Sequence, residues 1–336
     1  MKVLDETAVP AGSLDGSTVV VLGYGNQGRP QALNLRDSGC EVLVAARAGG
    51  EGAERAARDG FSVLDPRAGA EAADVLMMLV PDEVQGAVFA ETVRGRLRPG
   101  SALCFAHGFA VAFGGVSSPE HDIVMVAPKG QGRRVREAYL EGTGLPCLIA
   151  VERDATGGAR RTALGIARAL GCLRVGAIET SFREEAVSDL FGEQAVLVGG
   201  VPALVKSAFR LLVEKGCTPE VAYFECVHEL KIIVDLVAER GFSGMRRMIS
   251  GTAAYGGLKY GERLVTEETV REMRRLYDRI ESGAFAGDWL DEARRGCGSL
   301  EELIVLERDA DIERTGTRVR KLFPGGDGEA EPGGRQ

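Results

Sequence analysis

The sequence predicts an α/β N-terminal domain, with a parallel sheet covered by helices on both faces, followed by an all-α C-terminal domain. In the first half, short apolar runs alternate with helical patterns, and the runs lack the in/out alternation of a sheet with one wet face. From residue 183 to 323 no convincing strand pattern occurs. We therefore predict domains at 1–181 and 182–325, with a disordered Gly/Pro-rich tail at 326–336.

Each element is expected from its own local pattern. The first strand lies in STVVVLGYGNQG (17–28) and runs into a glycine turn. The other expected strands are 41–47, 73–81, 101–108, 121–130 and 146–152, and the helices between them are 29–38, 52–59, 83–95, 133–140 and 158–170. The expected C-terminal helices are 183–198, 201–215, 219–240, 266–282 and 286–296. Helix 219–240 has clear ends, because Thr218 can cap it, Pro219 suits its first turn and Gly241 follows it.

Composition argues against several classes of protein. The net charge of −8 gives no electrostatic support for binding nucleic acid. No apolar run approaches the roughly 20 residues of a membrane span, and the N-terminus has no apolar signal core. The 7 cysteines lack metal-site spacing and lie mostly in apolar runs, which indicates buried thiols in a reducing compartment. We expect a cytoplasmic protein without a nucleic-acid or membrane partner.

A glycine-rich turn predicts a dinucleotide site. It has the spacing GxGxxG, follows a strand, precedes a helical pattern, and is followed by a second strand about 20 residues on. The first glycine permits the tight turn, the second admits a pyrophosphate close to the backbone, and the third lets helix and strand pack. The alternative is a structural turn that binds no ligand. The turn consists of Gly23, Tyr24, Gly25, Asn26, Gln27 and Gly28.

The end of the second strand bears on the choice of cofactor. An acidic side chain there would bind the ribose hydroxyls of NAD, whereas Arg47 favours the 2′-phosphate of NADP. Glu51 would repel that phosphate, and Arg55 could compensate. Arg47 could also be a solvated surface charge. We predict NADPH, and NADH stays open.

Two acidic pairs predict a metal site in the helical domain. Asp189 and Glu193 are four residues apart in the apolar stretch SDLFGEQAVLVGG, and Glu225 and Glu229 repeat the spacing in a helix that is apolar nearly all round. Buried carboxylates need partners, and four could converge around Mg²⁺ or Mn²⁺, which prefer oxygen ligands. His228 is expected to be a hydrogen-bonded core histidine. The alternative is pairing of the acids with Arg183, Lys206, Arg210 or Lys231.

Two further residues are expected at one edge of the sheet. His107 follows one predicted strand and Lys129 follows the next. Ligands of open α/β sheets bind beyond the carboxyl ends of the strands. Either side chain could therefore reach the nicotinamide end of a cofactor, or could be structural.

At these motifs the chain resembles ketol-acid reductoisomerase (acetohydroxyacid isomeroreductase) of the short class I form. The resemblance covers roughly residues 3–325 and is carried by GYGNQG, ALNLRDSG, AHGF, MVAPKGQG, YLEGTGLPCLIAV, SDLFGEQAVLVGG, ECVHELKIIVDL and MISGTAAYG. It implies an N-terminal Rossmann domain, a knotted helical C-terminal domain, and a homodimer or higher homo-oligomer with shared sites. The implied reaction is a Mg²⁺-dependent alkyl migration of a 2-acetohydroxy acid such as 2-acetolactate. NADPH then reduces the product to a 2,3-dihydroxy acid, in valine and isoleucine synthesis.

The resemblance also implies roles for individual residues. Asp189 would bridge two Mg²⁺ ions, and Glu193 would bind one of them. Glu225 and Glu229 of the partner subunit would complete the metal shell, with Glu229 close to the substrate, and Ser250 would hold the substrate carboxylate. The expected catalytic residues are His107, Lys129 and Glu193. The expected cofactor contacts are the glycine turn, Arg47, Asp82, Glu83, Val84, Gln85 and Gly132.

Several positions depart from the family pattern without removing a predicted metal ligand. Arg29-Pro30-Gln31 stands where the family has His-Ala-His or similar, Gln131 replaces a proline, and Ala254 replaces a glutamate. The other departures are Ala110 and Ala112, in place of Asn and His, and Gly50 and Gly52, in place of serines. They leave open a paralogous Mg²⁺- and NAD(P)H-dependent reductase of another ketol or 2-keto acid in a specialised pathway.

Overall fold

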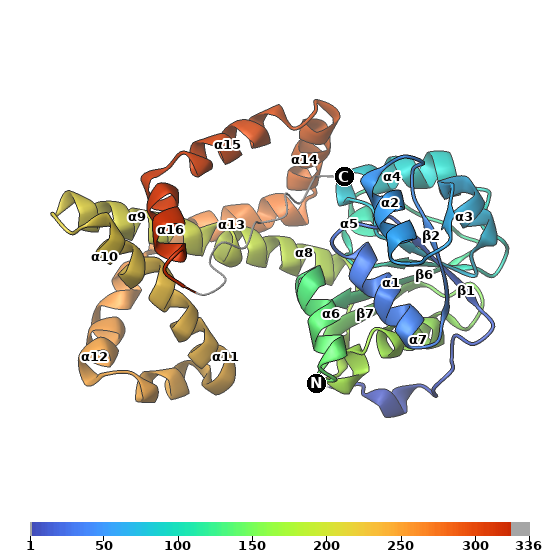
Figure 1. The fold of residues 1–336 in the computed structure, drawn as a ribbon, viewed down its shortest axis with the longest axis horizontal. Helices are drawn as coiled ribbons and strands as arrows, with labels where there is room; N and C mark the ends of the chain where they lie inside the picture. The colour runs from blue at the N-terminus through green and yellow to red at the C-terminus, as the bar shows by residue number, and fades with distance from the viewer. Residues whose placement is uncertain (1, 324–336) are drawn as a thin grey trace. The chain divides into compact units, whose positions relative to one another are not determined.

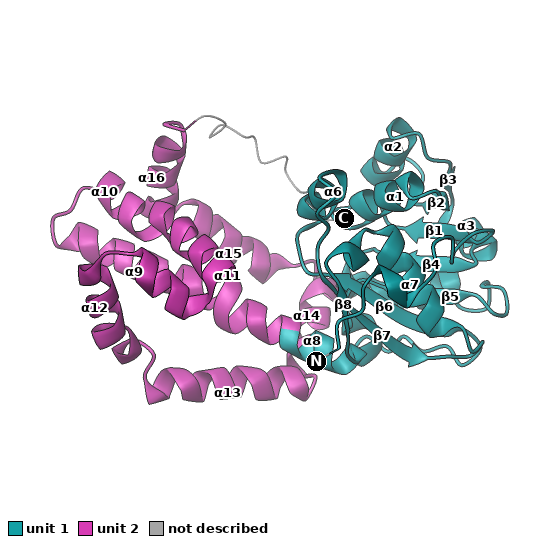
Figure 2. Ribbon diagram, turned by 90° about the horizontal axis from the view of Figure 1, so that it is seen from below, with its two compact units in different colours: residues 1–188, 333–336 teal, residues 189–332 magenta. Residues whose placement is uncertain are grey.

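The computed structural model describes residues 2–323, and the chain divides into two compact units (Figures 1 and 2). Unit 1 contains the described residues up to Ser188, and unit 2 begins at Asp189. The division falls inside one continuous helix, α8 (Phe182–Gly192). The predicted tail at 326–336 lies outside the described residues.

Unit 1 is built on an eight-stranded sheet in the order β3-β2-β1-β4-β5-β6-β7-β8. Its strands are β1 (Thr18–Leu22), β2 (Glu41–Ala45), β3 (Val63–Leu64), β4 (Val75–Met78), β5 (Ala102–Phe105), β6 (Asp122–Pro128), β7 (Cys147–Arg153) and β8 (Ala177–Glu179). The first six strands pair in parallel, as predicted, and β8 pairs in parallel with β7.

The sheet departs from the predicted parallel arrangement at β7, which runs antiparallel to β6. The reason lies in the connection between these strands. Pro128, the last residue of β6, pairs with Cys147, the first of β7, and Lys129 N donates to Pro146 O at 2.9 Å. The chain therefore re-enters the sheet at the edge it has just left, so the new strand must run the opposite way.

Helices cover both faces of this sheet (Figure 1). Successive residues of β1 serve opposite cores, with Val19 and Val21 in one and Val20 and Leu22 in the other. The first core is closed by α1 (Gly28–Asp37), α2 (Glu51–Arg58) and α7 (Ala159–Ala169), and the second by α3 (Pro66–Ala72), η2 (Phe89–Val93) and α5 (Phe109–Ala112). The remaining helices are η1 (Glu6–Ala8), α4 (Asp82–Val88), α6 (Gly132–Leu140) and η3 (Cys172–Arg174). Burial on both faces explains the unbroken apolar strand runs.

Unit 2 is helical throughout its described part, as predicted (Figure 2). Its helices are α9 (Gly200–Glu214), α10 (Pro219–Tyr223), α11 (Glu229–Met248), α12 (Gly251–Tyr260), η6 (Gly261–Arg263), α13 (Glu267–Glu281), α14 (Ala284–Arg294), α15 (Gly298–Arg308) and α16 (Asp311–Arg320). Two π-helical turns, η4 (Glu193–Leu197) and η5 (Phe224–His228), interrupt the α-helical run. The knot implied by the resemblance stays a prediction.

The helix predicted at 219–240 is only partly as expected. Thr218 is its N-cap residue and Pro219 its first residue, but the π-helical turn η5 separates α10 from α11. Gly241, with a φ of 68°, interrupts the helix, and helical backbone resumes as far as Met248. A glycine can take this left-handed conformation without strain, so it marks a kink and not an end.

Unit 2 buries little of its apolar surface within one chain. Its core cluster contains Phe209, Ala222, Tyr223, Ile312 and Val319. On α11, which the sequence predicts to be a core helix, Met245 is buried while Ile232 and Val234 are exposed. His228 is exposed and stacks on Phe323, with ring centroids 4.6 Å apart, so the expectation of a core histidine is wrong.

The helical stretch Phe182–Glu214 is long and apolar enough to cross a membrane by length and composition, contrary to the sequence expectation. A single stretch of this kind is weak evidence for a membrane protein. Most of it, from Asp189 on, belongs to unit 2, whose other helices also expose large apolar side chains, including Phe242, Leu258 and Leu306. Large exposed apolar patches mark surfaces that another protein or a membrane covers.

Candidate active site

The glycine turn between β1 and α1 has the geometry of a dinucleotide site. Gly23 has a φ of +99°, and a Cβ there would lie 2.8 Å from the backbone of Leu79. A Cβ on Gly28 would lie 2.0 Å from Gly23 O, whereas a Cβ on Gly25 would meet no atom within 4 Å. The first and third glycines are therefore required by packing within the protein, and the second faces open space. A pyrophosphate at the N-terminus of α1 fits that space.

The turn is supported by the segment that follows β6. Gln27 Nε2 donates to Gly130 O at 3.3 Å, and Gln27 Oε1 accepts from Gln31 Nε2 at 3.1 Å. A Cβ on Gly132 would lie 1.6 Å from Asn26 O, so no other residue fits there without a shift of the backbone. Close packing thus explains why residue 132 is a glycine. Its contact with the cofactor stays a prediction.

The region after β2 carries the conflicting charges expected from the sequence. Arg47 is exposed just after that strand, and Gly50 N donates to its carbonyl at 3.1 Å to form a turn. Glu51 is the first residue of α2 and lies 3.9 Å from Arg55. A positive and a negative side chain therefore flank the place where the adenosine ribose of a dinucleotide binds in such folds.

Two of the expected cofactor contacts at 82–85, Asp82 and Gln85, form hydrogen bonds within unit 1. Asp82 Oδ2 lies 2.9 Å from His107 Nδ1. Gln85, which is buried, donates from Nε2 to Asp82 Oδ1 at 3.1 Å and to Val80 O at 2.8 Å. Gln85 thus holds the carboxylate of Asp82 in place, and this carboxylate orients the ring of His107. Glu83 and Val84 lie in the first turn of α4 and are at least partly exposed.

Glu185 connects the two predicted catalytic residues, and the sequence reasoning missed it. Its side chain is 2% exposed on α8. Oε1 accepts from Lys129 Nζ at 2.9 Å, Oε2 accepts from Gly108 N at 2.8 Å, and His107 Nε2 lies 3.8 Å from Oε2. His107 and Lys129 follow the adjacent parallel strands β5 and β6, so they lie at the expected edge of the sheet. The signal for Glu185 was its position four residues before Asp189.

Gly108 lets α8 approach the end of β5. A Cβ at this position would lie 2.2 Å from Phe182 O and 3.2 Å from Ala186 Cβ. The close approach brings the Gly108 N–H within reach of Glu185. The glycine in AHGF is therefore a packing requirement of the cluster.

We expect Gly108→Ala to lower the free energy of unfolding by about 2 kcal/mol, because the added methyl group overpacks the contact with α8. Urea unfolding of the purified variant measures this loss. Gly287→Ala is the matched control, since Gly287 lies in α14 and a Cβ there meets no atom within 4 Å. Equal stability of the two variants would contradict the packing account.

The donor set at α8 fits a divalent cation. Glu185 and Asp189 are one turn apart on this continuous helix, and with His107 they offer three ligand atoms within 4.8 Å of one another. Carboxylate oxygens are the ligands that Mg²⁺ prefers. Within residues 2–323 this is the one group of His, Cys, Asp or Glu compact enough to hold a metal.

The expected convergence of two acidic pairs does not occur within one chain. Glu193, Glu225 and Glu229 are exposed, and none belongs to the compact group. All three lie at π-helical turns, because Glu193 begins η4, Glu225 lies in η5 and Glu229 follows it. Such turns are rare and occur frequently at functional sites. Their roles as metal ligands stay predictions.

Ser250 is the N-cap residue of α12. Its Oγ accepts from Ala253 N at 3.1 Å, and the ten-residue helix begins at Gly251. The hydroxyl proton remains available to a ligand oxygen, and the N-terminus of a helix attracts anions. This environment fits the predicted binding of a substrate carboxylate.

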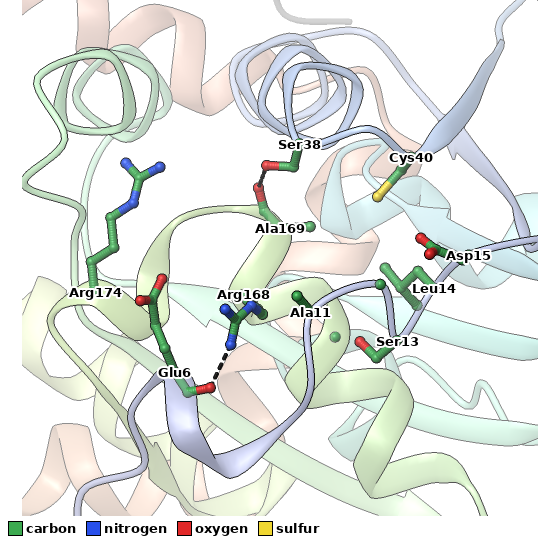
Figure 3. A pocket seen from close by; sticks show the side chains of 12 residues that line it. Glu6, Ala11, Ser13, Leu14, Asp15, Ser38, Cys40, Arg168, Ala169 and Arg174 are labelled. Carbon is green, nitrogen blue, oxygen red and sulfur yellow. Dashed lines mark hydrogen bonds between the residues drawn. The ribbon is translucent and has the colours of Figure 1, made fainter.

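A cavity of about 240 Å³ has a lining that includes none of these residues. Figure 3 shows the side chains that line it. It is lined by Ser38 and Cys40, which precede β2, and therefore lies near the amino ends of the strands. Arg168, which also lines it, donates to the carbonyl oxygens of Glu6 and Val9. The cavity is thus at the wrong edge of the sheet for the glycine turn, and this arginine is occupied in holding the N-terminal segment.

Comparison with known proteins agrees with this geometry. Residues 13–176 match the family model of the acetohydroxy acid isomeroreductase NADPH-binding domain, and residues 182–325 match that of the ketol-acid reductoisomerase C-terminal domain. The ketol-acid reductoisomerase (NADP(+)) of Pyrobaculum calidifontis is 49% identical over 93% of this chain and 95% of the relative. That of Methanothermobacter thermautotrophicus is 46% identical over 96% of this chain and 98% of the relative.

A solved structure gives the same result for the fold. The NADH-preferring ketol-acid reductoisomerase from an uncultured archaeon has a TM-score of 0.92 and 41% sequence identity. The match covers 96% of this chain and 99% of that one. With both domain models matched in order and close relatives matched over nearly their full length, the chain belongs to the ketol-acid reductoisomerase family.

Proposed function

We propose that this ketol-acid reductoisomerase of branched-chain amino acid biosynthesis acts on 2-acetolactate and related 2-acetohydroxy acids. The alkyl group of the substrate migrates, and the resulting 2-keto acid is reduced to a 2,3-dihydroxy acid. The observation that carries the proposal is the cluster of Lys129, Glu185 and His107, together with Asp189 one helical turn beyond Glu185. It provides acid–base groups beside oxygen ligands at the carboxyl edge of a nucleotide-binding sheet.

The glycine turn supports the reduction step. Gly25 leaves room for a pyrophosphate, and the backbone at the start of α1 can donate to it. A bound NAD(P)H supplies the hydride for the keto group. Lys129 and His107 lie beyond the ends of β6 and β5, where residues of such a sheet face the bound substrate.

The acidic residues support the migration step. Asp189 and Glu193 of one chain would hold Mg²⁺ together with Glu225 and Glu229 of the partner subunit. The metal would supply Lewis-acid polarisation of the ketone and alcohol oxygens of the substrate. Glu185 keeps the ammonium group of Lys129 in place through its 2.9 Å bond, so that a proton can be held or moved at Lys129 Nζ.

A second copy of the chain is the partner that covers the apolar face of unit 2. Phe242 is 74% exposed in the single chain, and Leu258, Leu303 and Leu306 are also exposed. Burial of such side chains supplies most of the free energy of stable association. Light scattering should give a molar mass of at least twice 35.7 kDa, and a monomer at micromolar concentration would contradict the shared site.

The compartment is inferred from the thiols. The 7 cysteines are all free, with Cys104, Cys147 and Cys172 buried and the other four only partly exposed. The sequence expectation of mostly buried thiols is therefore correct for three of them. A chain with this many unpaired thiols suits a reducing cytoplasm.

The test of the proposed function separates its two steps. Purified protein is mixed with Mg²⁺, 2-acetolactate and either NADPH or NADH, and the absorbance of the reduced nicotinamide is followed. A parallel assay supplies the rearranged 3-hydroxy-2-keto acid. Mg²⁺-dependent oxidation with both substrates is expected. Activity on the rearranged acid alone would identify a reductase without migration and overturn the proposal.

We expect Glu51→Ser to raise the ratio of kcat/KM for NADPH to that for NADH by about fivefold. The reason is that Glu51 begins α2 beside the predicted site of the 2′-phosphate and repels it. The matched control is Glu54→Ser, which removes an exposed charge from the same helix one turn later. An unchanged ratio for Glu51→Ser would mean that this side chain does not face the ribose.

A further inference from the structure

Asp59 lies where three segments of unit 1 meet. It is the C-cap residue of α2, and its carboxylate accepts from the Tyr24 hydroxyl at 2.8 Å. Arg29, in the first turn of α1, binds the same carboxylate through Nε at 2.7 Å and Nη2 at 3.1 Å. One carboxylate therefore joins the end of α2 to the glycine turn and to the start of α1.

The chain segment after Asp59 is held by the same face of α1. Arg36 Nη1 donates to Asp59 O at 2.7 Å, and its guanidinium lies 4.7 Å from the ring centroid of Phe61. The Phe61 ring also meets the ring of Tyr24 edge to face, with centroids 5.7 Å apart. The side chain of Tyr24 is thus enclosed by the residues that its hydroxyl helps to fix.

The charges of Arg29 and Asp59 have the unfavourable sign for the helix ends at which they lie. A basic residue is unfavourable in the first turn of a helix, and an acidic residue is unfavourable at a C-terminus. Arg29 and Asp59 occupy such positions. Each compensates the unfavourable charge of the other, because the two side chains form a bidentate ion pair. Their placement is explained by this contact and not by local helix stability.

Asp59 and Tyr24 are in the protonation states that their hydrogen bond needs. The Arg29 guanidinium holds the pKa of the Asp59 carboxyl below its usual value, so this group is ionised at neutral pH. Burial raises the pKa of Tyr24, and the bond to Asp59 raises it further, so the phenol stays protonated and donates.

We propose that Tyr24, Arg29 and Asp59 form a clamp that positions α2 for the adenosine half of the dinucleotide, and that Arg29 is a positioning residue and not a phosphate ligand. The clamp fixes one end of α2 to the glycine turn, and the other end begins at Glu51, next to the ribose site. A helix of eight residues is only about 12 Å long, so fixing one end also fixes the other. The inference rests on the proposed nucleotide site.

A double-mutant cycle tests the clamp. The full-length variants Arg29→Gln, Asp59→Asn and the combination of both are titrated with NADPH, NADH and ADP-ribose by calorimetry, and their Tm is measured without nucleotide. Each single variant should weaken binding of all three ligands by about threefold to fivefold, and the double variant should bind no worse than either single one. ADP-ribose is included because it lacks the nicotinamide.

Two further variants separate geometry from charge. Arg29→Lys keeps the charge but loses the planar fork, so it should bind more weakly than wild type. Arg58→Gln is the control, since Arg58 carries an exposed positive charge on α2, directly before Asp59, and lies 4.0 Å from Glu54. It should bind as wild type does.

Four results would overturn the inference. Weaker binding by Arg29→Gln with unchanged or tighter binding by Asp59→Asn would make Arg29 a direct phosphate ligand. A lower Tm with unchanged dissociation constants would make the contact structural only, and additive losses would separate the two residues. Wild-type protein that bound none of the nucleotides would overturn the proposed function as well, and this control distinguishes the two failures.

Discussion

Asp189→Asn is expected to reduce the rate of isomerisation by about a thousandfold and to abolish its dependence on Mg²⁺. Asp189 lies one turn from Glu185 on α8, and its carboxylate belongs to the compact group of possible metal ligands. Asparagine keeps the shape of the side chain but removes the charge that a divalent cation needs. Mg²⁺ titrations of the rate with 2-acetolactate measure both effects.

The nucleotide site is expected to survive this change, because the glycine turn lies in unit 1, where it packs on Leu79 and is bonded to Gly130. The dissociation constant of NADPH should therefore equal that of wild type. Asp235→Asn is the control, since Asp235 is an exposed carboxylate on α11 that pairs with Lys231. Near-normal turnover of Asp189→Asn would exclude Asp189 as a metal ligand.

Glu185→Gln is expected to lower kcat by about a hundredfold with both the substrate and the rearranged 2-keto acid. Glutamine can still accept from Gly108 N, but its amide cannot replace the charged acceptor that holds Lys129 Nζ at 2.9 Å. The ammonium group then loses its buried partner and moves from the reacting atoms. The effect on the reduction step distinguishes this variant from one that loses only the metal.

The neighbouring residue provides the control. Glu184 lies next to Glu185 on α8, but it is exposed and accepts from Thr180 Oγ1 at 2.7 Å. Glu184→Gln should therefore retain wild-type kcat. If the two variants were equally active, Glu185 would have no part in catalysis beyond filling its place in the core.

The predictable part of the sheet came from unbroken apolar runs. The apolar runs that became β1, β4, β5 and β6 are buried on both faces, so their composition alone indicated a covered parallel sheet. Two strands escaped because β3 has only two residues and β8 only three, too few for any period. The antiparallel direction of β7 depends on how the chain returns after α6, which no local pattern records.

The unpredicted helices have their own physical reasons. The ten residues of α12 include three glycines, which lower intrinsic helix propensity by about 1 kcal/mol each. In α15 the run LIVL is apolar without helical spacing, and its side chains are exposed within the single chain. Because these side chains do not pack into the core of the single chain, their pattern could not be read against that core.

The position of a candidate site residue could be predicted where it follows a recognisable strand, and not where it depends on how a helix packs. His107 and Lys129 follow strands that pair directly, so their shared edge was already implied by the order of the sheet. Glu185 was missed because its burial depends on Gly108, which lets α8 approach β5. Extending the spacing of Asp189 and Glu193 back by one turn would have indicated it.

The π-helical turns make this protein sensitive to chain length in a way that substitutions do not reveal. Each such turn contains one residue more than a regular α-helical turn, and each residue rotates the helix by about 100°. Deleting a single residue within Phe224–His228 would give a more regular helix, yet it would point Glu229 to another side. For Glu225 and Glu229, the number of residues between the carboxylates is therefore constrained as strongly as their identity, and engineering by insertion or deletion should avoid this turn.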